Sequence, residues 1–115
     1  MELEEKLREL MNAMDQLESQ NGELYYNYSK LFARICGRKK YVLDVTMIMI
    51  NKACALQPEN SDFASELGYQ MCLNENYKEA FSTYQLAATY NETNMDPLYG
   101  MIYCHIRQEM LDDAQ

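Results

Sequence analysis

The sequence predicts an all-α protein, an α-solenoid of antiparallel helix pairs with about six helices and a truncated last one. Apolar residues recur at helical spacing through most of the chain, and no segment alternates convincingly with period two. Glycine and proline are scarce, at 4 and 2 of 115 residues. A helix–turn–helix pattern also recurs about every 34 residues, which is typical of a repeat array.

The first half of the chain predicts three helices. The first covers residues 1–18, whose apolar stripe consists of Leu3, Leu7, Leu10, Met14 and Leu17. The second covers residues 23–36 and ends at Gly37, because glycine readily adopts the backbone conformation that follows a helix. The third covers residues 41–57, and Pro58 stops it because proline disfavours helix in the residue before it.

The second half continues the same alternation. A fourth helix begins at the capping residues 61–62 and ends at the turn 74–76. A fifth spans residues 77–90, a sixth begins at Asp96, and a last helix begins at Leu111.

We interpret residues 1–115 as one repeat array. Residues 1–18 form the second helix of a partial repeat, 23–57 a repeat with a loop insertion, 62–91 a repeat and 96–115 a truncated repeat. Neither end carries the polar cap of a finished array, so we expect a fragment of a longer one. Self-association is expected through exposed Leu3, Leu7, Leu10 and Met101.

The charge and composition argue against several functional classes. A formal charge of −8 disfavours nucleic-acid binding, and the basic cluster at 38–40 is too short to overturn this. There is no secretory signal and no apolar run long enough to enter a membrane, so we expect a cytoplasmic protein. Four dispersed cysteines indicate reduced thiols rather than a metal site, and His105 forms no recognisable catalytic arrangement. We therefore expect no metal, no cofactor and no enzymatic activity.

The repeat resembles the tetratricopeptide repeat, whose pattern includes Leu-Gly in the first helix and Ala and an aromatic in the second. The resemblance implies a right-handed solenoid. Ala64, Met71 and Glu92 depart from the pattern. The residues that we assign to repeat packing are Tyr28, Ser29, Ala53, Pro58, Leu67, Gly68, Ala80, Tyr84, Ala87 and Ala114.

Gly68 lies inside an expected helix, where glycine costs roughly 1 kcal/mol relative to alanine. We expect it at a helix crossing, where two backbones approach closely. Ala80 and Ala87 are the expected small surface on the second helix.

Two runs, GELYYNYSKLFARICGR and LQPENSDFASELGYQM, are similar to the tetratricopeptide repeat protein 21 family. Members are long repeat subunits of intraflagellar transport complex A. The resemblance implies a role in retrograde transport along cilia and in cilium assembly. It also implies contacts with other subunits of that complex, at the ciliary base and along the axoneme.

In tetratricopeptide arrays the first helices line a concave binding face. By helical phase this face holds Tyr26, Lys30, Arg34, Ser65, Tyr69, Leu73, Tyr99, Tyr103 and Arg107. Tyrosine and arginine are enriched at interface hot spots, which favours protein binding.

Two alternatives remain open. The chain is either a scaffold segment or an autonomous peptide-binding adaptor, like the co-chaperones that grip carboxyl termini. Tyr26, Lys30, Asp96 and Gly100 occupy the positions where such a clamp needs lysine, asparagine, lysine and arginine, which disfavours carboxylate gripping. A coiled-coil dimer through residues 3–17 is less favoured, because the stripe is too short.

Overall fold

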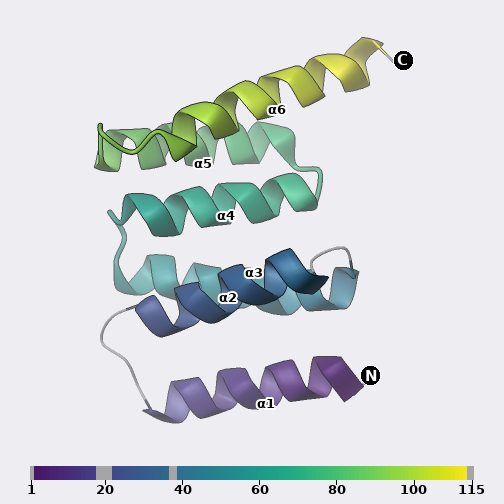
Figure 1. The fold of residues 1–115 in the computed structure, drawn as a ribbon, viewed down its shortest axis with the longest axis vertical. Helices are drawn as coiled ribbons and strands as arrows, with labels where there is room; N and C mark the ends of the chain where they lie inside the picture. The colour runs from purple at the N-terminus through teal and green to yellow at the C-terminus, as the bar shows by residue number, and fades with distance from the viewer. Residues whose placement is uncertain (1, 18–21, 37–38, 114–115) are drawn as a thin grey trace. The chain divides into compact units, whose positions relative to one another are not determined.

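The computed structural model describes residues 2–17, 22–36 and 39–113, and these form six α-helices and no strand (Figure 1). Within each unit, neighbouring helices pack against one another as in an α-solenoid, so the predicted fold class is confirmed. Gly37, Arg38 and Ala114, to which the sequence analysis assigned roles, lie outside the described residues.

The contacts divide the chain into two compact units, residues 1–58 and 59–115. The first unit contains α1 (Glu2–Leu17), α2 (Glu23–Cys36) and α3 (Lys40–Leu56). The second contains α4 (Ser61–Leu73), α5 (Tyr77–Tyr90) and α6 (Asp96–Asp113).

In the first unit, the apolar stripe of α1 packs mainly on α3. Leu7 and Met14 are buried, whereas Leu3 and Leu10 are half-buried. The expectation that Leu7 is exposed is therefore wrong, because α1 already has a partner helix inside this unit. Met101, in the second unit, is half-buried.

Two polar links hold the helices of the first unit together. The Ser29 hydroxyl, on α2, is fully buried and donates to the Thr46 carbonyl of α3 at 2.7 Å. The Asp15 carboxylate accepts a hydrogen bond from the Tyr25 hydroxyl and lies 3.1 Å from the Lys52 ammonium. These contacts join α1 to both α2 and α3.

In the second unit, the residue that caps α4 precedes the expected capping residues 61–62. Asn60 is the capping residue, because its side-chain oxygen accepts from the Phe63 amide at 3.0 Å. Ser61 instead donates its hydroxyl to the Ala87 carbonyl at 2.7 Å. The last carbonyls of a helix have no partner within it, and Ser61 satisfies one of those at the end of α5.

The turn at 74–76 lies where the sequence predicted it, with Glu75 in the left-handed region at φ 59°. The end of the chain differs from the prediction. No separate helix begins at Leu111, because α6 continues unbroken to Asp113. Residues 101–113 contain no glycine or proline, so nothing in the sequence interrupts the helix there.

The Tyr84 ring, on α5, is the centre of the second unit and lies against glycines of both neighbouring helices. A Cβ atom placed on Gly68 of α4 would lie 3.0 Å from Cε1 of Tyr84. A Cβ atom on Gly100 of α6 would lie 2.5 Å from both Cε atoms of the same ring. Gly68 thus makes room for an aromatic ring, because the atoms nearest to its Cβ position belong to the Tyr84 side chain rather than to a backbone.

Candidate protein-interaction surface

Helix α6 carries apolar residues on all sides. Pro97 and Cys104 face the interior of the second unit and are fully buried. Apolar side chains also occupy the opposite side of the helix, which is typical of a helix covered on both sides. We define the outer face of α6 as Tyr99, Ile102, Tyr103, Ile106 and Met110, which are 65, 58, 49, 51 and 56% exposed.

One edge of this face is held in place by Tyr77 of α5. The Arg107 Nε donates to the Tyr77 hydroxyl at 3.2 Å, and its guanidinium lies 5.6 Å from the centre of that ring. The hydrogen bond from Arg107 to Tyr77 raises the pKa of the guanidinium. Tyr103 meets the same ring edge-on, with 6.3 Å between centroids. Side chains ordered in this way lose less entropy when a partner binds.

The predicted residues of α2 form a second surface, in the first unit. Lys30 and Arg34 are exposed and Tyr26 is half-buried. The Lys30 ammonium lies 3.4 Å from the Tyr26 hydroxyl and 5.4 Å from the centre of its ring. Arg34 donates to the Lys30 carbonyl at 3.3 Å, so the three side chains form one continuous row along α2.

The predicted residues of α4 offer less surface. Ser65 is buried, at 8% exposed, so its side chain is not accessible as the concave-face prediction requires. Tyr69 and Leu73 are half-buried. The helical phase that placed Ser65 on a surface describes one helix alone and carries no information about what packs on it.

Three residues of the outer face of α6 were missed from the sequence: Ile102, Ile106 and Met110. The signal was present, because α6 has no polar side. The concave face expected from the repeat pattern runs along the positions aligned with Tyr99, and these three residues lie on neighbouring positions of the helix.

The residues assigned to repeat packing differ in their exposure. Buried members are Ser29, Ala53, Gly68, Ala80, Tyr84 and Ala87. Tyr28 and Leu67 are half-buried and Pro58 is exposed. Tyr28 stacks on Phe32, with 6.2 Å between ring centroids and 16° between planes.

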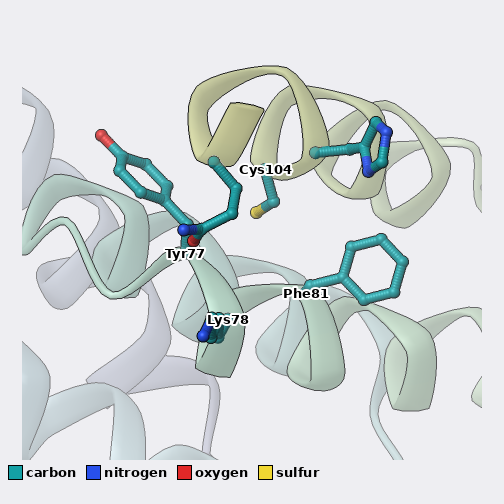
Figure 2. Close-up of a pocket in the computed structure, with 6 residues that line it drawn as sticks. Tyr77, Lys78, Phe81 and Cys104 are labelled. Atoms are coloured by element: carbon teal, nitrogen blue, oxygen red, sulfur yellow. The ribbon is translucent and has the colours of Figure 1, made fainter. Parts of the chain in front are cut away.

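A pocket of about 250 Å³ lies between α5 and α6 (Figure 2). Tyr77, Phe81 and Cys104 line it, and Lys78, His105 and Gln108 surround them. Burial raises the pKa of the Cys104 thiol, whereas a nucleophilic cysteine needs a lowered pKa. The walls are therefore suited to an apolar group rather than to catalysis by a thiolate.

The neighbouring His105 is occupied at the surface. Its Nε2 lies 3.0 Å from a carboxylate oxygen of Glu109, one helical turn away, and both side chains are largely exposed. Within the described residues, no three His, Cys, Asp or Glu side chains are grouped so as to hold a metal ion. The same part of the chain has no helix with the length and apolarity needed to cross a membrane.

Comparison with known proteins agrees with the family resemblance. A family model described as the second ARM domain of tetratricopeptide repeat protein 21 matches residues 5–115. Tetratricopeptide repeat protein 21B of Homo sapiens is 41% identical over 109 residues, and that of Mus musculus is 40% identical. Tetratricopeptide repeat protein 21A of Homo sapiens is 29% identical over 109 residues. Each match covers 95% of this chain but only 8% of the relative's length. The chain thus belongs to the tetratricopeptide repeat protein 21 family, as its sequence runs indicated.

Proposed function

We propose that this chain is a non-catalytic protein–protein interaction scaffold, a segment of an intraflagellar transport complex A subunit. In that role it acts in retrograde ciliary transport and cilium assembly, in the cytoplasm, at the ciliary base and along the axoneme. Its partners are other subunits of the complex. Membership of the tetratricopeptide repeat protein 21 family supports this proposal.

The observation that carries the proposal is the outer face of α6. Its five large side chains are each about half exposed or more. Aromatic residues, methionine and arginine are enriched at the centres of protein interfaces, where most charged residues are depleted. Tyr99, Tyr103 and Met110 are of these types, and Arg107 lies at the edge of the face, fixed by Tyr77. A face of this composition is suited to burial against another protein surface.

Two features favour binding over catalysis. The raised pKa of Cys104 keeps its sulfur protonated near neutral pH. His105 contacts the exposed Glu109 rather than a nucleophile. The pocket cysteine is therefore not an activated nucleophile at neutral pH, and the histidine does not contact one.

The test replaces Ile102 and Ile106 with serine together in the full-length protein. We expect capture of complex A subunits to fall about tenfold or more, because central interface residues carry most of the binding energy. Leu86→Ser is the matched control, since Leu86 is an apolar side chain of similar exposure, 55%, on α5 rather than on α6. Tyr99→Ala should act like the isoleucine variant. Tyr103 is less suitable because its ring contacts Tyr77.

Two outcomes would contradict the proposal. Unchanged capture would show that the outer face of α6 contacts no partner. Loss of protein abundance with unchanged capture per molecule would assign the face to packing within the same polypeptide. Separately, saturable binding of an acidic carboxyl-terminal peptide by the 115-residue chain would favour the adaptor alternative.

A further inference from the structure

Two buried thiols lie next to each other in the second unit. Cys72 of α4 and Cys104 of α6 are 32 residues apart in sequence, and their Sγ atoms are 3.4 Å apart. Cys104 is 1% exposed and Cys72 is 9% exposed. A disulfide bond is roughly 2.0 Å long, so the two sulfur atoms would have to approach by about 1.4 Å from their separation of 3.4 Å.

The surroundings hold the two thiols in this position. Both belong to one core cluster with Tyr77, Ala80 and Tyr84. The Tyr84 ring packs in this cluster and lies against the glycines of α4 and α6. The contact between the thiols is therefore part of a packed core and does not depend on a surface loop.

One of the two thiols also lies at a pocket wall. Figure 2 shows the Cys104 sulfur between Tyr77 and Phe81, and Cys104 is among the residues that line the pocket of about 250 Å³. A water molecule takes up about 30 Å³ in the liquid, so hydrogen peroxide fits in this space, next to the wall to which Cys104, only 1% exposed, belongs. Cys104 is among the described residues that line the pocket, whereas Cys72 is not, so we take Cys104 as the thiol that meets the oxidant first.

We propose that Cys72 and Cys104 are a redox-active pair, which hydrogen peroxide converts into a disulfide that joins α4 to α6. The Cys104 thiolate attacks one peroxide oxygen, so that an S–O bond forms and the O–O bond breaks. The departing hydroxide takes up the proton released by the thiol and leaves as water, which leaves a sulfenic acid on Cys104.

The Cys72 sulfur then attacks the Cys104 sulfur. An S–S bond forms, the S–O bond breaks, and the leaving hydroxide takes the Cys72 proton as a second water. The two thiols together lose two electrons and the peroxide gains two. No other reactant is needed.

The reaction has a characteristic pH dependence. Burial raises the pKa of Cys72 to about 12 and also raises that of Cys104. The thiolate is the reactive form, so the reaction is slow at neutral pH. We expect its rate to rise about tenfold for each pH unit below the pKa of the attacking thiol. The oxidation rate of a solvent-exposed thiol of ordinary pKa would stop rising at a lower pH.

The experiment treats the folded 115-residue chain with hydrogen peroxide and follows its intact mass. We expect the loss of two hydrogen masses and a peptide map that joins Cys72 to Cys104. Cys54→Ser is the matched control, because Cys54 is a half-buried thiol of the first unit and should leave the crosslink unchanged. Cys72→Ser should instead accumulate a sulfenic acid at Cys104 that dimedone traps.

The proposal is overturned if the folded chain gains oxygen at other sites without this crosslink. It is also overturned if the crosslink forms only in urea, because the native contact would then play no part. The peptide map of the wild-type chain is enough to decide whether the Cys72–Cys104 crosslink forms, even if the Cys72→Ser variant fails to fold. The crosslinked chain should melt at a higher temperature than the reduced chain, and a lower melting temperature would contradict a disulfide that fits the native packing.

Discussion

Replacing Gly100 with alanine tests whether the Tyr84 ring is confined between α4 and α6. The new Cβ atom would lie 2.5 Å from both Cε atoms of the ring, well inside van der Waals contact. On its other side the ring already packs against Gly68 of α4, where the position of a Cβ atom is 3.0 Å from its Cε1, so the ring has little room to move that way. The overlap must therefore be relieved by separating the helices or by forcing Tyr84 out of its rotamer.

The magnitude follows from two opposing effects. Overpacking a core costs about 1–3 kcal/mol, and this overlap belongs at the upper end. Alanine in a helix interior gains about 1 kcal/mol over glycine. We therefore expect Gly100→Ala to lower the free energy of unfolding by about 2 kcal/mol. In Gly68→Ala the same two effects nearly cancel, because the ring needs to shift by only a few tenths of an ångström.

The assay is urea unfolding of the 115-residue chain, followed by circular dichroism. Gly68→Leu places a much larger group against the ring and should cost about 1–3 kcal/mol. Tyr84→Leu removes the Cε and Cζ atoms, so in that background Gly100→Ala should no longer destabilise. A double-mutant cycle measures this coupling. If Gly100→Ala is as stable as the wild type, the ring is not confined and the reasoning is refuted.

Two further predictions concern polar contacts. Asn60→Ala should lower the free energy of unfolding by about 1 kcal/mol, because the Phe63 amide loses its acceptor. Asn60→Ser should retain most of the wild-type stability, because serine also caps helices. If urea titrations show that both variants lose the same free energy of unfolding, the cap is contradicted. The Tyr25 hydroxyl, followed by the Lys52 ammonium, holds the pKa of Asp15 below its ordinary 3.8. The carboxylate thus contributes stability that is complete above that value and is lost as pH falls through its lowered pKa. Between neutral pH and about pH 3, the free energy of unfolding should fall less in Asp15→Asn than in the wild type. Identical decreases in the two proteins would refute this prediction.

Local features of the sequence predicted most of the helices correctly. Apolar spacing located the buried stripe of α1, and Pro58 marked the end of α3 because proline disfavours helix before it. The cap of α4 was assigned to Ser61 and Asp62 instead of Asn60, because all three residue types cap helices and only the geometry separates neighbours. The absence of glycine and proline after Gly100 already argued for one continuous α6.

The candidate site was less predictable. Helical phase grouped Tyr103 with Arg107, because residues four apart share a face, and both side chains contact Tyr77. It did not reveal that Tyr77 holds both, since that contact crosses about 30 residues of chain. It also did not show that Ser65 is buried, because burial depends on which surface meets the helix.

The sequence by itself determined that the chain is all-α, where five of its helices lie and to which family it belongs. These properties depend on residue types at short spacing and on similarity along the chain. Only the tertiary structure decided that Gly68 and Gly100 accommodate one tyrosine ring, and that Cys72 contacts Cys104. Periodicity states which side of a helix is apolar, but not which atoms of another helix it meets. Those contacts depend on how α4, α5 and α6 pack together.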